Sequence, residues 1–572
     1  MQAMTRTTRN LALLFGSGLA TIPALAGTPV ALDFVPTDSD AVLVIPQFGE
    51  FLSEVPAMNA VLGEDGMPML NMIAAMIRGM PGIDLEGSAA GVLEITRPNE
   101  HDVSARGVVL VPVTDFAEFS KGHAFADGLF KMPMGETTLF FRQVSEGYAA
   151  VGDEADRVRD FDGAAGRLAA NGALVGKAGG RMASGNDLFV YLNFDAFGDE
   201  IAKGQEQMES QGEMVRAMGG DEAGQGFDAF IEAAESIAND GSVLMMGLNF
   251  DDTVGMSFDI GVQFAEGSTT ASYLQNDGDA GKYFSNVPAM DYFFANAFDL
   301  SGSGVQAMMN DYFVASGEMD AGVEGFDWEK MLTGVNGGVQ VVGASDNMMG
   351  GLLNNTLHFI DVDEPDMYMD VAREAFAGIN GGAMLAGMDD QATSINDVDA
   401  YGFNVGADLS SFDELAGGFG APSPTMILGL VFGPAGGPDG YFAEVGGGVV
   451  STFTKDAGFF ASAVAAADGE GTLLSGSTLA QSSALLPDNR IYEGYFGAGA
   501  VMNTVGPMLM MFGILPEFEP IESMAPVGFG MTADGGGVMF RTVVPMQVLD
   551  VVSEMMPERV DEVADGEEDV SF

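Results

Sequence analysis

The sequence predicts an α+β protein made of two tandem, divergent copies of a curved, mainly antiparallel sheet with helices packed on one face. Two long hairpins carry this prediction. Gly241 to Leu274 and Ala525 to Leu549 each contain two runs of apolar and β-branched residues on either side of a turn rich in Asp or Gly. This pattern is the local signature of a β-hairpin. Because it occurs twice, it indicates an internal duplication.

Six stretches of the first half recur in the same order in the second half. The first pair matches a strand at Ala41 to Ile45 and a helix at Phe48 to Leu62 with a strand at Tyr292 to Phe298 and a helix through Met308. Four further pairs begin at Ile83 and Phe326, Gly107 and Leu357, Glu146 and Asp439, and Asn186 and Asp488, and the hairpins form the sixth. Strands return through hairpins and short helices instead of regular βαβ crossovers, which predicts antiparallel sheets.

The sequence also predicts where the parts of the chain begin and end. We expect a signal peptide at residues 1–26, a first copy at 27–280, a second copy at 284–556 and an acidic tail at 557–572. The boundary between the copies falls near Gln275 to Asn286, which is polar and carries glycine, as domain linkers do. A helical insert is expected at about 196–238, where Lys203 to Met218 and Phe227 to Ala238 predict an α-hairpin around Gly219-Gly220.

The N-terminus has the pattern of a secretory signal peptide. Arg6 and Arg9 form a basic start, an apolar run from Leu11 to about Ala20 follows, and Ala24-Leu25-Ala26 offers a cleavage site of small residues. Because the two arginines are not adjacent, the pattern predicts the general secretory route and a periplasmic or extracellular protein. No later segment reaches about 18 consecutive apolar residues, so we expect no transmembrane segment in the mature chain.

The composition is acidic and free of cysteine. Asp and Glu number 83 against 22 Lys and Arg in 572 residues, which gives a formal charge of -61. A field of this sign repels phosphate backbones and acidic lipid headgroups, so it argues against nucleic-acid and anionic-membrane partners. The acidity serves either solubility in salty water or the binding of divalent cations. The lack of cysteine excludes disulfides, thiolate nucleophiles and cysteine zinc sites.

No catalytic constellation emerges from the sequence. The three histidines, His101, His123 and His358, lie far apart in the chain, which disfavours histidine metal sites and Ser-His-Asp chemistry. The mature sequence also lacks a Gly-x-Ser-x-Gly elbow and a His-Glu-x-x-His helix. We therefore expect a non-enzymatic protein with no catalytic, cofactor-binding or metal-binding residues.

The densest acidic cluster, Asp361 to Asp366 with Asp370 beyond, allows two interpretations. Alternating carboxylates can converge on Ca²⁺, but this segment lacks the mid-loop glycine and the closing glutamate of an EF-hand. Pro365 suits the first position of a helix and the acids suit a helix N-terminus, so capping is the favoured interpretation. Asn276 to Asp279 and Asn396 to Asp399 are likewise predicted to be turns first and metal sites second.

Two further patterns invite a functional interpretation. Gly172 to Arg181 is similar to a phosphate-binding loop, but it has one residue too few between Gly172 and Gly176, and Ala178 replaces the Ser or Thr that would hold Mg²⁺. A flexible surface loop is predicted there. The 39 methionines are interleaved with other apolar residues and have no nearby histidine, which favours irregular core filling over a copper(I) site. A third interpretation is that Met and Phe side chains line a cavity for an apolar ligand.

Recurring short patterns point to a type of protein. They are YAAVGD at Tyr148, YFAEVG at Tyr441, the LPDN turn at Leu486, and the closing VVPMQVLDVV from Val543. In these patterns the chain resembles exported tandem-repeat proteins of unknown function from planctomycetes and other environmental bacteria. The resemblance implies export and a duplicated architecture, and it brings no site residue with it.

Together these observations predict an exported, soluble, non-enzymatic protein of the cell envelope or periplasm. Two alternatives stay open. One is a carrier for an apolar, lipid-like ligand in a cavity lined by Met and Phe, and the other is a hydrolase that uses carboxylates. No cofactor is expected, and the partners that the composition allows are an apolar ligand and a divalent cation.

Overall fold

The computed structural model describes residues 28–555, with gaps at 63–67, 97–103, 135–136, 312–333, 345–350, 379–383, 408–428 and 514–517, across most of 199–237, and at a few shorter positions. The chain is an α+β protein with antiparallel strand pairing, as the sequence predicts. The predicted signal peptide (1–26), most of the helical insert (196–238) and the acidic tail (557–572) lie outside the described residues. Among the helices of the described part, none is long and apolar enough to cross a membrane.

The chain divides into two compact units. The first comprises Met1–Phe51 and Ile77–Tyr191, and the second comprises Leu52–Met76 and Leu192–Phe572. The boundary expected between residues 280 and 284 falls inside the second unit. The compact units therefore do not follow the expected copies, and the pairing of the two hairpins described below gives the reason.

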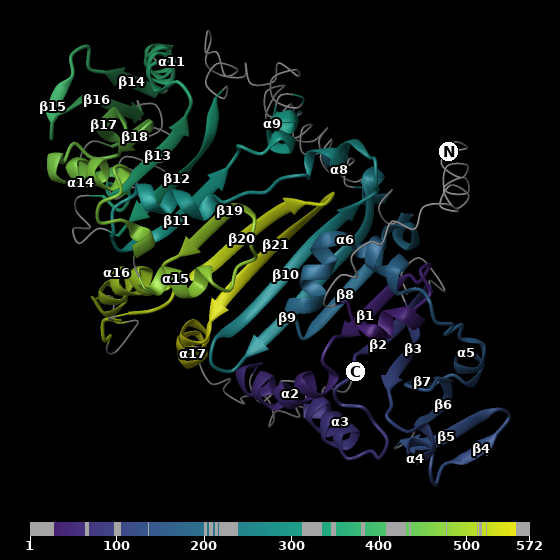
Figure 1. Ribbon diagram of the computed structural model, residues 1–572. Coiled ribbons are helices and arrows are strands. Elements are labelled where there is room, and N and C mark those ends of the chain that lie inside the picture. The colour runs from purple at the N-terminus through teal and green to yellow at the C-terminus, as the bar shows by residue number, and fades with distance from the viewer. Residues whose placement is uncertain are drawn as a thin grey trace, which may run out of the picture. The chain divides into compact units, whose positions relative to one another are not determined.

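The sheet of the first unit has the strand order β8-β1-β2-β3-β7-β6-β5-β4 (Figure 1). Its strands are β1 (Ala41–Ile45), β2 (Ala89–Thr96), β3 (Ser104–Pro112), β4 (Ala124–Ala126), β5 (Leu129–Met134), β6 (Thr137–Ser145), β7 (Tyr148–Gly152) and β8 (Leu188–Asn193). The helices of this part of the chain are η2 (Val30–Phe34), α2 (Phe48–Leu62), α3 (Pro68–Arg78), α4 (Phe116–Phe119), α5 (Ala155–Asp160) and α6 (Leu168–Gly185). Strand β1 and helix α2 have the predicted bounds.

Helix α6 replaces the surface loop predicted for Gly172 to Arg181. The helix is kinked at Gly176, whose φ of 61° is left-handed. Val175 and Met182 are buried on its apolar side. Burial of an apolar side stabilises a helix more than intrinsic propensity does, so packing overrides the glycines that suggested a loop.

The sheet of the second unit has the strand order β9-β10-β21-β20-β19-β11-β12-β13-β18-β17-β16-β14, and every neighbouring pair is antiparallel (Figure 1). Its strands are β9 (Gly241–Asp251), β10 (Gly255–Phe264), β11 (Tyr292–Asp299), β12 (Val335–Gly343), β13 (Thr356–Val362), β14 (Met384–Met388), β16 (Val398–Ala407), β17 (Asp439–Val445), β18 (Gly448–Thr452), β19 (Arg490–Phe496), β20 (Val527–Asp534) and β21 (Gly537–Pro545). The short β15 (Thr393–Ile395) also pairs with β16.

Helices and turns connect these strands. The elements are η3 (Phe194–Phe197), α8 (Thr269–Tyr273), η4 (Ala280–Asn286), α9 (Ser303–Met309), α11 (Pro365–Gly378), α14 (Ala457–Ala467), η9 (Leu473–Ser475), α15 (Ser477–Ser483), α16 (Ala498–Met511) and α17 (Met546–Met555). Side-chain caps set several of the starts. The carboxylate of Asp456, for example, accepts from the backbone N–H of Phe459 and begins α14.

Both predicted hairpins are present, and they share one sheet. In the first, Asp251 Oδ1 accepts from the backbone N–H of Thr253 at 2.8 Å and closes the turn between β9 and β10. In the second, the turn between β20 and β21 uses Gly535 and Gly536, whose φ angles are 64° and 76°. Strand β10 then pairs with β21 along its whole length. Separate sheets were expected, but the free edges of the two hairpins satisfy each other's backbone hydrogen bonds.

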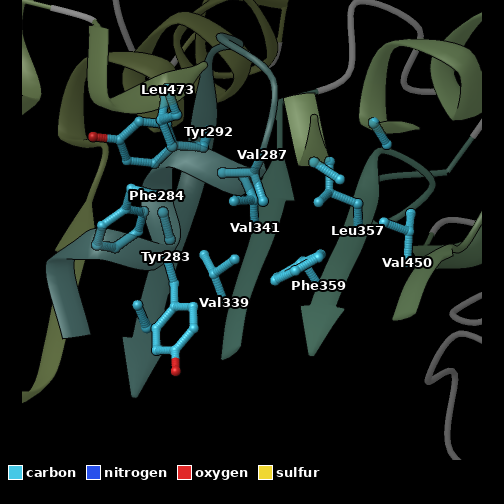
Figure 2. Packing of buried hydrophobic residues seen from close by; sticks show 14 of the residues in the cluster. Tyr283, Phe284, Val287, Tyr292, Val339, Val341, Leu357, Phe359, Val450 and Leu473 are labelled. Atoms are coloured by element: carbon cyan, nitrogen blue, oxygen red, sulfur yellow. The ribbon is translucent and has the colours of Figure 1, made fainter. Parts of the chain in front are cut away.

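The sheet of the second unit has two faces, which we call inner and outer. The inner face carries Asp259 and Val339 and the outer face carries Phe258, because side chains alternate along a strand and register partners share a face. The main core lies on the inner face, where Val339 and its neighbours pack against η4 and α14 (Figure 2). Its aromatic members are Tyr283, Phe284, Tyr292, Phe359, Phe460 and Tyr495.

A second core lies on the opposite side of the same strands. There Tyr368 and Met369 of α11 pack against Val362 and Val449. Helices therefore cover both faces at this end of the sheet, where helices on one face were expected. The physical reason is that Ile360, Val362 and Val449 put apolar side chains on the outer side as well, so this end of both sides needs a cover.

Candidate functional site

The outer face of strands β9, β10, β21, β20 and β19, which lie side by side in Figure 1, is apolar. One row of register partners on this face consists of Leu248, Phe258, Thr542, Phe529 and Gly494. The next row consists of Met246, Ile260, Phe540, Met531 and Tyr492. None of these ten residues carries a charge. We call this surface the apolar platform.

Two side chains on β10, the second strand of the apolar platform, are open to solvent. Phe258 is 44% exposed and Ile260 is 40% exposed. On the same face, the rings of Phe529 on β20 and Phe540 on β21 stack with their centroids 6.2 Å apart. An antiparallel sheet that faces water on one side ordinarily places polar residues there. The platform reverses that arrangement, which is typical of a surface that binds something.

The apolar platform is large enough to hold a ligand. Five strands spaced at about 4.8 Å make it roughly 20 Å wide, and successive outward residues lie about 6.8 Å apart along each strand. Two or three outward positions on each strand therefore give an apolar area of about 300 Å². Apolar patches of a few hundred Å² on monomeric proteins are often functional.

The charged groups of these strands lie on the inner face. Asp259 is fully buried, and Arg541 donates to its two carboxylate oxygens, Nε to Oδ1 at 2.7 Å and Nη2 to Oδ2 at 2.6 Å. The third donor of this guanidinium, Nη1, reaches the carbonyl oxygen of Leu485 at 3.3 Å. A matched, bidentate pair of this kind is the form in which a carboxylate tolerates burial.

A second buried carboxylate, Glu493 on β19, is satisfied in a similar way. Arg490 Nε donates to its Oε2 at 2.8 Å, Ser483 Oγ donates to its Oε1 at 3.0 Å, and the hydroxyl of Tyr495 also donates to Oε1. Burial raises the pKa of Tyr495 above its ordinary value, and the charge of Glu493 raises it further. The hydroxyl therefore keeps its proton. On these strands two buried carboxylates thus lie on the inner face, while the outer face carries exposed apolar side chains.

The structure brings together one pair that sequence reasoning missed. His358 and Ser451 face each other on β13 and β18, with Ser451 Oγ 3.3 Å from His358 Nδ1. Burial lowers the pKa of His358 to about 4, so its imidazole is neutral at pH 7. The two residues are 93 positions apart in the chain, and only the register of the sheet makes them neighbours.

The acidic stretch around Pro365 belongs to the start of a helix. Helix α11 begins at Pro365, as predicted. The carboxylates before it point to different partners, since Asp361 accepts from the hydroxyl of Tyr283 at 3.3 Å and Asp363 accepts from Asn336 Nδ2 at 2.9 Å. Within the described residues, no group of three or more His, Cys, Asp or Glu side chains is arranged to hold a metal ion.

The other Asn- and Asp-rich stretches serve the backbone. Asn396 and Asp397 form the turn between β15 and β16 with φ angles of 55° and 64°, the left-handed values that a two-residue hairpin turn requires. The predicted turn there is confirmed. Asn276 is buried, and its Oδ1 accepts from the backbone N–H of Val305 at 3.1 Å. It fastens α9 to the segment that precedes η4.

The first unit contains a cavity of about 310 Å³ between β2, β3 and α5, lined by both charged and apolar residues. Its arginines already have acidic partners: Arg157 donates to Glu94 and, at 2.9 Å, to Glu154, while Arg106 lies 3.2 Å from Glu154. Asp40 also lines the cavity and accepts from the backbone N–H of Ile95 at 2.7 Å. The lining thus combines charges that are already paired with apolar side chains such as Val92 and Phe161.

The chain matches no protein-family model, no curated protein and no solved structure. Its function must therefore be inferred from its own side chains. The apolar platform departs from an ordinary solvent-facing sheet, because its exposed residues are apolar while Asp259 and Glu493 lie buried beneath it.

Proposed function

We propose that this chain is an exported, non-enzymatic binding protein of the cell envelope or periplasm, and that the apolar platform carries a lipid-like ligand. One observation carries the proposal. Phe258 and Ile260 on β10 stand exposed in an apolar face whose strands turn their charges to the other side. The signal-peptide pattern in residues 1–26 supports export.

The charge of the chain favours a single small molecule as the occupant. Two copies of the chain, each with a formal charge of -61, repel one another, and an anionic bilayer repels the chain in the same way. An individual apolar molecule without negative charge meets neither repulsion. The occupant is therefore a single lipid-like molecule, and neither a second copy nor a membrane surface.

The carboxylates beneath the apolar platform favour binding over catalysis. A general base needs a carboxylate that can reach a substrate and accept a proton from it. Asp259 and Glu493 are instead buried and neutralised by Arg541 and Arg490. Their geometry supports a structural role below a binding surface.

We also infer that the chain arose by tandem duplication. In the first unit the strands, numbered along the chain, have the spatial order 8-1-2-3-7-6-5-4. The strands from β11 to β19 have the same order when the short β15 is set aside. A shared hairpin is common, but a shared order of eight strands supports common descent. On this reading, the apolar platform forms where the closing hairpins of the two copies pair.

Nile red, an uncharged dye that fluoresces in apolar surroundings, tests the apolar platform on the full mature chain. We expect saturable binding to the wild-type chain. The double variant Phe258→Ser with Ile260→Ser should lose roughly tenfold in affinity or more, because about 1.4 kcal/mol of apolar contact corresponds to that factor. Native mass spectrometry after mild extraction provides a second readout, in which a co-purifying lipid is expected.

Phe125→Ser is the matched control. Phe125 lies on β4 in the first unit and is 63% exposed, so the same chemical change is made on a different surface. It should leave the affinity for the dye unchanged. Equal affinities of the wild-type chain and the double variant, or no saturable binding at all, would overturn the proposed function.

A further inference from the structure

The outer face of the sheet changes from apolar to polar beyond β19. The row that contains Phe258 and Phe529 crosses β19 at Gly494 and continues onto the next four strands. Its members there are Asn296 on β11, Gln340 on β12, His358 on β13 and Ser451 on β18. We call these four residues the polar strip. It adjoins the apolar platform on the same face.

Three buried polar atoms on the outer side of the described β11 and β13 have no hydrogen-bond partner. They are Asn296 Oδ1, Thr356 Oγ1 and His358 Nε2. Thr356 is only 1% exposed and precedes His358 by two positions, so it shares the outer face. Roughly 90% of buried polar groups in folded proteins are paired, because an unpaired one costs about 1–3 kcal/mol. Three such atoms on one face of the adjacent strands β11, β12 and β13 indicate a partner from outside the chain.

The chemistry of the polar strip suits an uncharged head group. Neither the strip nor Thr356 offers a cation to a carboxylate or phosphate, and the His358 imidazole is neutral at pH 7. Asn296 Oδ1 only accepts hydrogen bonds, so the ligand must bring a donor to it. Thr356 Oγ1 takes either role, and His358 Nε2 takes the role that the proton on Nδ1 leaves to it. Hydroxyl groups, which donate and accept, match this set.

We propose that the polar strip binds the uncharged, hydroxyl-bearing head of an amphiphile whose acyl chain lies on the apolar platform. This inference rests on the proposed function and names its ligand class, a lipid with a glycerol-like or sugar-like head. The Tyr492 ring lies over the border between the two surfaces. Gly494 has no side chain there, and the Tyr492 hydroxyl lies 2.8 Å from the place a Cβ on Gly494 would take, so a polar group stands where the apolar platform meets the polar strip.

Phe453 stands over the polar strip. Its ring meets the His358 ring edge-on, with the centroids 5.2 Å apart, and its backbone N–H donates to the carbonyl oxygen of Thr356 at 2.9 Å. The Phe453 side chain is half-buried, whereas the unpaired atoms lie below the surface. The head group therefore reaches them when the Phe453 ring turns aside.

Monooleoylglycerol and oleate share an acyl chain and differ in the head group, so displacement of Nile red by each separates the head from the tail. We expect monooleoylglycerol to displace the dye from the full mature chain at a roughly tenfold lower concentration than oleate does. The double variant Asn296→Leu with His358→Phe should lose this preference and bind the dye as before. Its melting temperature should change little, because the loss of two unpaired polar atoms offsets the loss of the contact between His358 Nδ1 and Ser451 Oγ.

A second variant keeps the test decisive if the double variant does not fold. Phe453→Ala uncovers the polar strip without touching its polar atoms, and it should strengthen displacement by monooleoylglycerol but not by oleate. An equal effect on both lipids, or a preference that survives in the double variant, would overturn the head-group inference. If the variant Phe258→Ser with Ile260→Ser binds Nile red with unchanged affinity, the proposed function is overturned instead. The two failures are therefore distinguishable.

Discussion

Arg541 and Asp259 face each other across the junction of the two hairpins, with Nη2 2.6 Å from Oδ2 and Nε 2.7 Å from Oδ1. They are register partners on β21 and β10 and lie on the inner face, opposite Phe258. Because both groups are withdrawn from water, each charge depends on the other. The pair lets the two hairpins join while their outer face stays free of charge.

Removal of Arg541 should show how strongly the folded chain depends on its ion pair with Asp259. Arg541→Ala leaves Asp259 buried without a counter-charge and should lower the free energy of unfolding by about 3–5 kcal/mol. Arg106→Ala is the control, because its ion pair with Glu154 is exposed and contributes about 1 kcal/mol or less. Urea titration of both variants measures the difference. Equal losses of unfolding free energy in the two variants would mean that the buried ion pair stabilises the chain no more than the exposed one.

Stability should fall in acid partly through His358. Its pKa is about 4 in the folded chain against an ordinary 6.5, so between these values the unfolded chain binds a proton that the folded chain does not. The contribution is fully present above pH 6.5 and is lost as the pH falls toward 4, by up to about 3 kcal/mol. His358→Phe should therefore lose less unfolding free energy than the wild-type chain between pH 7 and pH 4.5. Identical losses in urea titrations would contradict this assignment.

Salt should stabilise the chain. With a formal charge of -61, carboxylates repel one another across the surface, and added ions screen that repulsion. We expect the melting temperature to rise with NaCl concentration in scanning calorimetry. A melting temperature that stays level or falls would show that self-repulsion does not limit stability.

Substitutions on the two faces of the hairpin sheet should differ sharply in cost. Met245 on β9 is fully buried, and Met245→Ala should lower the free energy of unfolding by about 2–5 kcal/mol. Phe258→Ser on the apolar platform should cost about 1 kcal/mol or less, because 44% of the side chain is exposed. Thermal unfolding of each variant provides the comparison. A large loss with Phe258→Ser would mean that the platform serves folding more than binding.

Local patterns were sufficient for several elements. Strand Ala41–Ile45 and helix Phe48–Leu62 have the predicted bounds, and α11 begins at the predicted Pro365. Turn chemistry and apolar periodicity act over a few residues, so a sequence displays them directly. Helix α6 was missed because its glycines indicate a loop locally, while burial of Met182 and its neighbours acts through the rest of the unit.

The polar strip could not be predicted from local sequence patterns, for a different reason. Asn296, Gln340, His358 and Ser451 are single residues on four strands, and only the register of those strands aligns them. No spacing in the chain records that register. The pairing of His358 with Ser451 and the neutral state of the imidazole follow from it.

Strand β10 separates what the sequence determined from what the tertiary structure decided. By itself the sequence determined a two-residue alternation, in which Phe258 and Ile260 take one face and Asp259 the other. Alternation alone assigns the apolar side to the core. The tertiary structure decided the reverse: Asp259 faces the core and the apolar side faces solvent. Arg541, 282 positions away, neutralises Asp259, and the carbonyl of Leu485 accepts from the same guanidinium. A charge matched from a distant strand costs far less to bury than an unpaired one, so the apolar side can remain exposed for a ligand.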